Sequence, residues 1–549
     1  MLNVSIFGVI LVYLMPLGTT LAEVFTAMVD LQNLVRGESH VIDVVDQYIE
    51  AEQQRLKRLR DIAHNYNQAN KETLRGENEL MTHPVNAFLM LKQLTSSWAD
   101  VESLMRHNSA EDFIKNITNR RAAMSVQFPS KEDLDGAGVA LLRLQDTYQI
   151  PTGEIASGRI RGISQNSKSL TARDCFELCR IAYNAQDYYH TVMWAKEALD
   201  RAEREVESSV DEAETLEYLA YSLYQQGNTK RALHLYRRIL ELDPDHPRAE
   251  GNIQYYEDQL RDQGETFSSP SDPDYEDVKD QNLPPLSNKR KDYYSTDSDW
   301  TNYEQLCRDE GNDKGPAYEA TLYCYYKNTH PIYGAYIRLA PIKAEIVHWK
   351  PKVVLFRDIL SYDEIEVLKL LAGPKLKRAT VKNGSKLVTV GYRIAKSAWL
   401  KDWDHPVCET VNKRIDMITN LDMVTAEELQ VANYGLGGHY EPHFDMSTIR
   451  DDRPSSQSDG NRVATLLLYL EAPEAGGATI FSRLKLTMFP SKYDGLFWHN
   501  LRRDGEPDLS TRHAACPVLS GQKWVTNKWI HERGQEFRRQ CALKPDEYE

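Results

Sequence analysis

Residues 433–445 read NYGLGGHYEPHFD and end on a histidine and an aspartate two positions apart. In an extended strand, residues i and i+2 point to the same face, so His443 and Asp445 would direct an imidazole and a carboxylate at one point. These groups are two of the three ligands in a 2-His-1-carboxylate site for non-haem Fe(II). H-x-D also occurs by chance, so the interpretation depends on a second histidine from another strand.

The third ligand has to come from the histidines beyond this stretch, which are His499, His513 and His531. His513 opens the apolar stretch HAACPVL, and Lys523 follows ten residues later in GQKWV. A two-residue turn between the two strands would make Lys523 face away from His513. We expect instead a three-residue loop, 520–522, which pairs Leu519 with Lys523 and brings Lys523 to the face of His513.

These residues lie in a C-terminal half whose pattern is typical of β structure. Short apolar runs are separated by clusters of Gly, Pro and Asp; the runs are EELQVANY, VATLLLYL, ATIF, LTMFP, GLFWHN and KWVTNKWI. No strong helical period crosses them. The pattern predicts a β-sandwich or jelly roll that begins near residue 300.

The N-terminal third has a helical period instead. Apolar residues alternate three and four apart from Ile42 to Tyr66, with Glu52 the one polar member of the series Ile42, Val45, Ile49, Glu52, Leu56, Leu59, Ala63 and Tyr66. This is a coiled-coil seam of about three heptads, which favours self-association; a helix packed inside its own chain is the alternative. Ser130 and Asp133 form a possible capping box for a later helix.

Residues 165–260 resemble a pair of tetratricopeptide repeats, with Leu219, Gly227 and Pro244 at the spacing of a helix pair. The tyrosines of this region are Tyr218, Tyr221, Tyr224 and, one helix later, Tyr255. Repeat core explains such aromatics, above all Tyr224. An exposed row would instead suit a proline-rich, extended peptide. Residues 262–299 are rich in Asp, Ser, Pro and Lys, which indicates a linker.

Residues 1–22 contain no charged side chain and end on Thr-Leu-Ala, which indicates a cleaved signal peptide; an uncleaved anchor is the alternative. No later stretch has the apolarity of a membrane helix. The sequons at Asn116 and Asn383 predict glycosylation in the secretory compartment. The formal net charge of −15 argues against a nucleic-acid partner.

The motifs NYGLGGHYEPHFD, STRHAACPVLSGQKWVTNKWIHERGQEFRR and QQG…LELDP together resemble the α subunits of collagen prolyl 4-hydroxylases. The resemblance covers nearly the whole chain after the signal peptide. It implies a multidomain chain, α-helical first and β second. Its parts would be a signal peptide (1–22), a helical dimerisation region (23–150), a peptide-binding domain (165–260), a linker (262–299) and a double-stranded β-helix dioxygenase domain (300–549).

The resemblance also implies roles for single residues. His443, Asp445 and His513 would hold Fe(II), and Lys523 would pair with the distal carboxylate of 2-oxoglutarate. Tyr434 and Thr479 are further candidates for the cosubstrate pocket, and Tyr218, Tyr221, Tyr224 and Tyr255 for the peptide site. The physical chemistry agrees, because three protein ligands leave metal positions for a keto acid and O2, and a buried carboxylate needs a fixed cation. A zinc site with the same ligands would give no reason for Lys523.

The implied reaction hydroxylates proline in X-Pro-Gly sequences of procollagen-like chains, with Fe(II), O2, 2-oxoglutarate and ascorbate. Two alternatives are a proline-rich-peptide adaptor with an idle catalytic domain and a hydroxylase for other secreted proteins. The implied partner is a protein disulfide isomerase as β subunit of an α2β2 tetramer. It would hold the chain in the endoplasmic reticulum lumen, since the final residues DEYE are not a retention signal.

Seven cysteines fit an oxidised fold. Their spacing suggests that Cys307 pairs with Cys324 and that Cys516 pairs with Cys541, tying the His513 strand to the C-terminal tail. Cys175 and Cys179 lie one helical turn apart and are expected as buried thiols, and Cys408 is unassigned.

Overall fold

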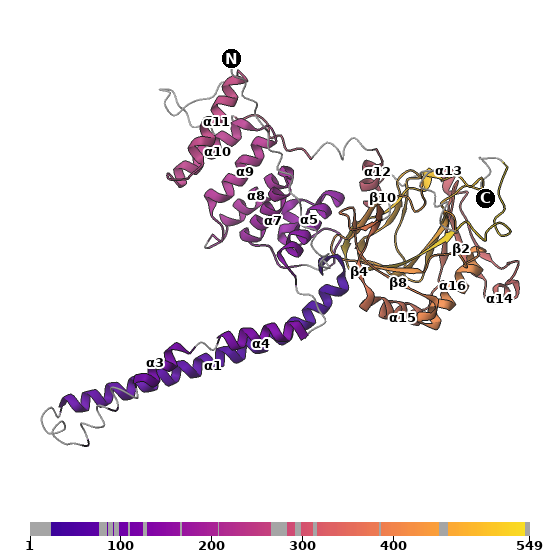
Figure 1. Ribbon diagram of the computed structural model, residues 1–549. Helices are drawn as coiled ribbons and strands as arrows, with labels where there is room; N and C mark the ends of the chain where they lie inside the picture. Colours follow the sequence, from indigo (N-terminus) through magenta and orange to yellow (C-terminus); the bar gives the residue numbers. More distant parts are fainter. Residues whose placement is uncertain are drawn as a thin grey trace, which may run out of the picture. The chain divides into compact units, whose positions relative to one another are not determined.

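The elements of the chain are shown in a computed structural model (Figure 1). The structure describes residues 24–75, 85, 92, 98–107, 110–123, 129–164, 167–206, 208–264, 283–290, 298–310, 316–383, 386–448 and 459–543. These residues form two compact units, one of residues 29–128 and one that combines the N-terminal segment up to Met28 with residues 129–549. The predicted signal peptide, residues 1–22, lies outside the described residues.

The smaller unit is built on one long helix. Helix α1 (Met28–Arg75) is 48 residues long, and α3 (Trp98–Arg106) and α4 (Ala110–Ala123) run along it (Figure 1). The Tyr48 ring meets the Phe113 ring edge to face at 5.5 Å. Arg55 donates a hydrogen bond of 3.1 Å from Nη1 to the carbonyl oxygen of Leu104. Val41 and Val44 are buried, so one stripe of α1 is covered by its own chain.

A second apolar stripe of α1 is solvent-exposed. Ile42 is 61% exposed, Val45 42%, Ile49 46% and Leu56 51%. These four residues belong to the predicted coiled-coil seam. Among the described residues, therefore, no part of the chain covers this side of the seam.

Helix α5 (Lys131–Tyr148) begins with the predicted capping box. The Ser130 side chain accepts from the backbone N–H of Asp133, and the Asp133 side chain accepts from the backbone N–H of Ser130. It packs on the repeat helices that follow it. A Cβ at Gly138 would lie 2.6 Å from Ile181 Cδ1, so a larger residue here would displace the end of the Ile181 side chain. Trp194 also donates a 2.9 Å hydrogen bond from Nε1 to Gln145 Oε1 of α5.

The tetratricopeptide-like region consists of antiparallel helices, as the sequence predicts. After α6 (Thr152–Ser157) come α7 (Ala172–Asn184), α8 (Tyr188–Ala202), α9 (Glu212–Gln225), α10 (Thr229–Leu242) and α11 (Ala249–Asp262). Cys175 and Cys179 are free and buried between them, as expected. Burial raises the pKa of the Cys175 thiol to about 12, so it is unreactive at neutral pH.

Part of the segment predicted as a linker is held against this helical region. Residues 283–290 are extended, and Asn228 binds both backbone groups of Ser287: Nδ2 donates to the carbonyl oxygen at 2.6 Å and Oδ1 accepts from the N–H at 2.8 Å. Arg290 then forms ion pairs with Asp146 of α5 at 2.9 Å and with Glu304 at 2.7 Å. The chain between the helical region and the β domain is therefore anchored at both ends of this stretch.

The C-terminal region is a double-stranded β-helix, in agreement with the predicted fold class. Its larger sheet has the strand order β1-β2-β3-β15-β11-β18-β9-β8-β4 and its smaller sheet the order β14-β13-β16-β10-β7. The bounds of the larger sheet are β1 Cys324–Lys327, β2 Ile342–Trp349, β3 Lys352–Arg357, β4 Lys377–Arg378, β8 Lys396–Leu400, β9 Leu429–Tyr434, β11 Arg462–Glu471, β15 Gly495–His499 and β18 Lys523–His531. Those of the smaller sheet are β7 Arg393–Ile394, β10 His439–His443, β13 Thr479–Phe481, β14 Leu486–Met488 and β16 His513–Ala515.

Two short strand pairs and several helices complete this region. The pairs are β5 (Val381–Asn383) with β6 (Lys386–Val388) and β12 (Ala475–Gly476) with β17 (Val518–Ser520). The helices are α12 (Ser298–Cys307), α13 (Pro316–Glu319), α14 (Gly334–Leu339), α15 (Tyr362–Ala372) and α16 (Pro406–Thr419). Buried apolar side chains from both sheets, such as Leu467, Phe481, Trp498 and Val525, form the core of the β-helix.

The predicted disulfide pairings are wrong in this structure. Cys307 pairs with Cys516 at a Cα–Cα distance of 5.5 Å, while Cys324 and Cys541 are free and exposed. The reason is tertiary packing: α12 lies on the smaller sheet, so the buried Cys307 meets the end of the His513 strand. Spacing along the chain does not reveal this contact.

The predicted glycosylation sites differ in their setting. Asn116 lies in α4, half-buried, and Asn383 ends β5, while the other two residues of its sequon, 384 and 385, are outside the described residues. Glycosylation at both positions stays a prediction. None of the helices in the described part of the chain has the length and apolarity that crossing a membrane requires.

Candidate active site

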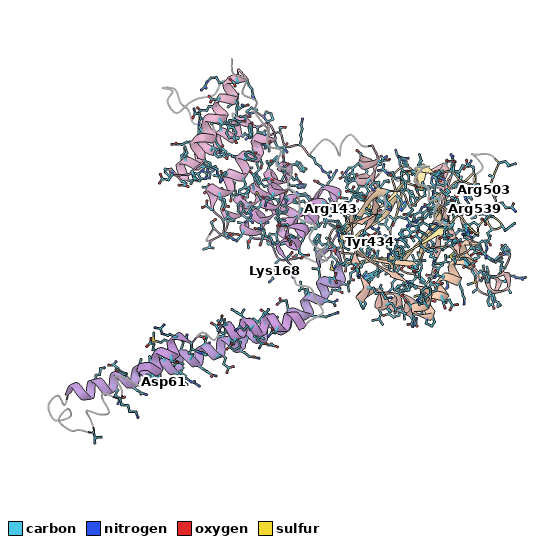
Figure 2. The ribbon with its side chains drawn as sticks, in the orientation of Figure 1. Asp61, Arg143, Lys168, Tyr434, Arg503 and Arg539 are labelled. Atoms are coloured by element: carbon cyan, nitrogen blue, oxygen red, sulfur yellow. A yellow bond between two sulfur atoms is a disulfide. The ribbon has the colours of Figure 1, made fainter. Side chains whose placement is uncertain are left out.

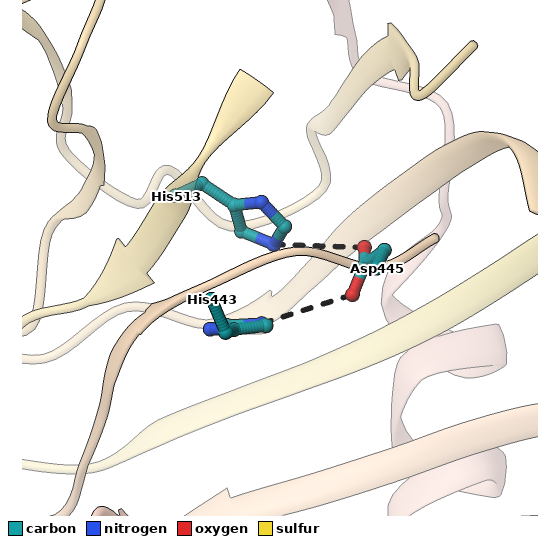
Figure 3. Close-up of side chains that lie close together, drawn as sticks. All are labelled: His443, Asp445 and His513. Atoms are coloured by element: carbon teal, nitrogen blue, oxygen red, sulfur yellow. Dashed lines mark ion pairs between the residues drawn. The ribbon is translucent and has the colours of Figure 1, made fainter. Parts of the chain in front are cut away.

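The structure brings His443, Asp445 and His513 together (Figure 3). His443 ends β10 and faces His513 of β16 across an antiparallel pair, while Asp445 lies two residues beyond the end of β10. Asp445 Oδ1 is 3.7 Å from His443 Nε2, and Oδ2 is 3.5 Å from His513 Nε2. The predicted convergence of two imidazoles and one carboxylate is therefore present.

Backbone carbonyls fix which ring nitrogen of each histidine is free. His443 Nδ1 is 2.8 Å from the carbonyl oxygen of Glu441, and His513 Nδ1 is 3.0 Å from that of Thr511. A carbonyl oxygen only accepts, so each Nδ1 carries the proton and each Nε2 presents a lone pair toward Asp445. This is the tautomer that a metal ligand requires.

The charges of the cluster also suit a divalent metal. Burial, together with the neighbouring His513, lowers the pKa of His443 to about 3. Burial opposes ionisation of Asp445, but His513, His443 and Arg462 outweigh it and hold the pKa of Asp445 at about 2. At neutral pH the cluster thus offers a neutral imidazole beside an ionised carboxylate, a donor set that fits Fe(II).

Aromatic rings hold both imidazoles. The Tyr440 ring stacks on His443 at 3.5 Å between centroids, and the Arg393 guanidinium lies 4.8 Å from the Tyr440 centroid. His513 meets Trp498 edge to face at 4.8 Å and Phe481 at 5.7 Å. Rotation of either imidazole would therefore require these rings to move.

Lys523 is buried in the β-helix, but it is not part of the hairpin that the sequence predicts. The expected pairing of Leu519 with Lys523 is wrong, because β17 pairs with β12 and β18 pairs with β9 and β11. Lys523 therefore lies opposite Tyr434 of β9. The chain crosses from one sheet to another between β17 and β18, so no hairpin register relates His513 to Lys523.

The Lys523 ammonium is buried, and no carboxylate among the described residues pairs with it. It is 1% exposed, donates a 2.7 Å hydrogen bond to the carbonyl oxygen of Gly477, and lies 5.3 Å from the Tyr434 ring centroid. Burial lowers the pKa of Lys523 to about 7. Burial makes the unpaired ammonium unfavourable. An incoming carboxylate would offset this cost, so the position favours binding of a carboxylate.

The two weaker candidates for the cosubstrate pocket are also buried. Tyr434 (labelled in Figure 2) lines the core beside Lys523, and burial raises its pKa, so its hydroxyl stays protonated. Thr479 accepts a 3.0 Å hydrogen bond from the Tyr469 hydroxyl. Tyr469 was not singled out from the sequence, because it stands in the apolar run LLLYL and looks like core.

Three further polar residues beside the triad were also missed by sequence reasoning. Arg462 donates a 3.0 Å hydrogen bond from Nη1 to the carbonyl oxygen of Asp445 and pairs with Glu427 at 2.5 Å. His531 Nε2 lies 3.1 Å from Glu427 Oε1, and its pKa is raised mainly by this carboxylate against the effect of burial. Such charges between apolar neighbours are a signal that could have identified them.

The predicted tyrosines gather on one face of the repeat helices. Tyr183, Glu217, Tyr218, Tyr221, Tyr236, Arg248 and Asn252 line a pocket of about 310 Å³. Tyr221 meets Tyr183 and Tyr188 at 5.6 and 5.8 Å, two tyrosines that the sequence did not single out. Tyr255 is 46% exposed and Tyr224 is half-buried, and their hydroxyls lie 2.7 Å apart.

Helix α5 touches the segments that precede and follow the ligand strands. Arg143 (labelled in Figure 2) donates 3.3 Å from Nη1 to the carbonyl oxygen of Gly437, just before β10. Tyr148 donates 2.5 Å to the carbonyl oxygen of Pro517, just after β16. The N-terminal segment adds a third contact, since a Cβ at Gly435 would lie 2.2 Å from the carbonyl oxygen of Phe25.

Fold and site together define an Fe(II)- and 2-oxoglutarate-dependent oxygenase. Residues 429–531 match the 2OG-Fe(II) oxygenase superfamily, residues 172–262 the prolyl 4-hydroxylase peptide-substrate-binding domain, and residues 27–162 the N-terminal region of the prolyl 4-hydroxylase α subunit. The chain is 49% identical to prolyl 4-hydroxylase subunit alpha-2 of Caenorhabditis elegans, over 98% of this chain and 97% of the relative. It is 42% identical to the human subunit alpha-1, over 96% and 97%. The chain belongs to the prolyl 4-hydroxylase α-subunit family.

The family confirms the predicted cofactors, which are Fe(II), 2-oxoglutarate, O2 and ascorbate. His443, Asp445 and His513 would hold the metal, and metal and cosubstrate supply the oxidising chemistry when bound. The protein's own part is to keep the His443 imidazole neutral, to hold Asp445 ionised, and to offer Lys523 to a carboxylate. The enclosing strands exclude water from these groups.

Lys523 should make cosubstrate binding depend on pH. A bound carboxylate favours the protonated ammonium, so binding above pH 7 requires proton uptake, and 2-oxoglutarate affinity should fall by up to about tenfold per pH unit. In Lys523→Arg the charge persists at all these pH values, so binding should be weaker but lose this dependence. Equilibrium binding of 2-oxoglutarate to the anaerobic, metal-loaded protein measures both effects.

The matched control is Lys528→Met on the same strand. Lys528 is also buried, with its pKa lowered to about 8 by burial, but it lies an odd number of residues from Lys523 and so on the other face of β18. Its replacement should leave the pH dependence intact. The same pH profile in Lys523→Arg as in the unmodified protein would exclude Lys523 as the cosubstrate cation.

Proposed function

We propose that this chain hydroxylates proline in X-Pro-Gly sequences of procollagen-like chains, giving 4-hydroxyproline, succinate and CO2. The observation that carries the proposal is the presence, in one chain, of a 2-His-1-carboxylate cluster with its buried lysine and of a tyrosine-lined pocket in a domain of the peptide-substrate-binding family. The complete ligand set favours an enzyme over an adaptor with an idle catalytic domain. A hydroxylase for other secreted proline-rich proteins differs only in substrate.

Hydroxylation of a proline-rich peptide tests the proposal directly. The full chain, co-expressed with a protein disulfide isomerase, should add one oxygen atom to prolines before glycine when Fe(II), 2-oxoglutarate and ascorbate are present. His443→Ala, Asp445→Ala and His513→Ala should each abolish this mass increase while the fold persists, because each removes one metal ligand. Peptide mass spectrometry and far-UV circular dichroism provide the measurements.

His499→Ala is the matched control, since His499 ends a barrel strand without belonging to the ligand cluster. It should keep most of the activity. Succinate formation with a non-collagen proline-rich protein but not with X-Pro-Gly peptides would favour the second substrate class. Peptide binding without any turnover would favour the adaptor.

The peptide platform proposed here consists of Tyr218, Tyr221, Tyr224 and Tyr255. Edge-to-face contacts hold the rings in place, as between Tyr218 and Phe176 at 5.4 Å and between Tyr224 and Tyr255 at 5.7 Å. Tyr236 and Tyr256, by contrast, are almost fully buried and belong to the repeat core. A rigid aromatic surface suits a polyproline II peptide, which loses little entropy on docking.

Replacing Tyr221 should therefore affect binding and not folding. In Tyr221→Ala the KM for long proline-rich substrates should rise several-fold, while that for short peptides and for 2-oxoglutarate stays unchanged. Steady-state kinetics with peptides of two lengths and thermal melts of the same samples test this. Tyr256→Ala is the comparison, because loss of a core aromatic should lower the melting temperature by several degrees. A melting-temperature loss in Tyr221→Ala as large as in Tyr256→Ala would mean that Tyr221 is core.

The proposed partner is a protein disulfide isomerase, which would supply the retention signal and keep the chain in the endoplasmic reticulum lumen. The secretory setting is supported by the predicted signal peptide, by the two sequons and by the Cys307–Cys516 disulfide. Co-purification with the isomerase from cells tests the partner. Sensitivity of the Asn116 and Asn383 glycans to endoglycosidase H tests the compartment.

Self-association through α1 follows from its exposed stripe. Ile42, Val45, Ile49 and Leu56 repeat three, four and seven positions apart on a helix whose other apolar side is already covered. Exposed apolar side chains in this spacing are typical of a coiled-coil interface, and a second copy of the chain supplies a matching stripe. We propose that two α subunits associate along this stripe.

A charge in the middle of the stripe should separate the subunits. Ile49→Asp should convert a dimer into a monomer, because the carboxylate would be buried beside its symmetry mate. Gln54→Asp is the control, as Gln54 is an exposed polar residue of the same helix. Sedimentation velocity of the full chain distinguishes the states. An unchanged mass in Ile49→Asp would exclude this interface.

A further inference from the structure

A chain of buried hydrogen bonds leads from Trp498 to the carboxylate of Asp445. Trp498 Nε1 donates to Asn500 Oδ1 at 2.9 Å, Asn500 Nδ2 donates to Thr465 Oγ1 at 2.9 Å, and Thr465 Oγ1 donates to Asp445 Oδ2 at 2.8 Å. Thr465 and Asn500 have no exposed surface, and Trp498 is 1% exposed. The three residues come from β11, β15 and the residue that follows β15.

The direction of every bond in this chain is fixed by chemistry. An indole N–H only donates, so the oxygen of the Asn500 amide must face Trp498 and its nitrogen must face Thr465. The Thr465 oxygen then accepts from Asn500, and its one proton is left for Asp445. Asp445 Oδ2 lies 2.8 Å away and accepts this proton. No alternative orientation satisfies all three groups.

Backbone pairing holds the chain in place. Thr465 lies opposite Trp498 in the antiparallel ladder of β11 and β15, and the Asn500 N–H donates to the carbonyl oxygen of Val463 at 2.8 Å. The Trp498 ring is also the one that meets His513 edge to face at 4.8 Å. One tryptophan therefore contacts one metal ligand directly and reaches a second through two polar side chains.

We propose that Trp498, Asn500 and Thr465 form a positioning relay that presents Asp445 to the metal in one orientation. The Thr465 hydroxyl donates to Oδ2 and thereby fixes the rotation of the carboxylate. A carboxylate fixed in this way loses little rotational freedom on metal binding, and groups that orient a ligand contribute to affinity. The relay concerns metal binding, so its test does not depend on which protein is the substrate.

Thr465→Val tests the relay, since valine has the shape of threonine without the hydroxyl. Titration of the anaerobic full chain with Co(II), followed by its visible absorption, should show affinity weakened by about 10- to 100-fold, with a changed absorption band. Thr465→Ser keeps the hydroxyl and should restore affinity to within a few-fold of the unmodified protein. A fall in Co(II) affinity in the serine variant equal to that in the valine variant would overturn the proposal.

The matched control is Thr526→Val in the same sheet. Thr526 is fully buried on β18, and within the described structure its hydroxyl has no hydrogen-bond partner. Its replacement tests the effect of a buried threonine-to-valine change alone and should leave Co(II) affinity unchanged. Equal losses in Thr465→Val and Thr526→Val would show a general effect of the sheet and would also overturn the relay.

Trp498→Phe and the double variant extend the test to the far end of the relay. Phenylalanine keeps a ring against His513 but removes the N–H that orients Asn500, so Co(II) affinity should fall by less than in Thr465→Val. In a relay, Trp498→Phe and Thr465→Val act on one chain of bonds. The double variant should therefore bind Co(II) no more weakly than Thr465→Val alone. Fully additive losses would mean that Trp498 acts only through His513.

Discussion

The protein interior holds two unlike charges that water does not reach, and much of the β-helix serves to tolerate them. Asp445 is held by two donors, since Arg462 donates to its backbone carbonyl oxygen and the Thr465 hydroxyl donates to its Oδ2. Among the residues that the structure describes, the Lys523 ammonium contacts a carbonyl oxygen and an aromatic ring but no carboxylate, and burial lowers its pKa. The protein itself supplies hydrogen-bond donors to Asp445, whereas the Lys523 ammonium would gain its counter-charge from the carboxylate of the cosubstrate. Binding of 2-oxoglutarate would therefore relieve a destabilising feature of the fold.

Helix α5 gives the catalytic region its connection to the peptide-binding helices. It packs on α7 through Gly138 and on α8 through Gln145, and its far side reaches the loops at Gly437 and Pro517. These loops adjoin the strands of His443 and His513. Both loop contacts are hydrogen bonds to backbone carbonyl oxygens, of 3.3 and 2.5 Å, so a shift of the helix would break them. Helix α5 thus contacts both the helices of the peptide-substrate-binding domain and the loops next to the metal site.

The sequence was sufficient where the relevant pattern is local. A period of two residues predicted that His443, which ends β10, and Asp445, two residues further on, converge; a period of three and four predicted α1, and a capping box predicted the start of α5. It failed where tertiary packing decides. The Leu519–Lys523 register failed because the chain changes sheets between β17 and β18, and the disulfide pairing failed because α12 returns to the smaller sheet. Thr465 and Asn500 carried no signal, since one lies in an apolar run and the other follows one.

The proposed cosubstrate site and the proposed tyrosine platform rest on different physical principles, and this difference should decide how each tolerates substitution. The cosubstrate site depends on a few buried polar atoms whose partners are fixed, so losing one hydroxyl or one charge leaves another group unsatisfied. The tyrosine platform depends on apolar area shared among several rings that hold one another edge to face. Loss of one ring there removes contact area but leaves no buried polar group alone. Substitutions at the platform should therefore shift substrate preference gradually, whereas those around Asp445 and Lys523 act on binding of the metal and of 2-oxoglutarate directly.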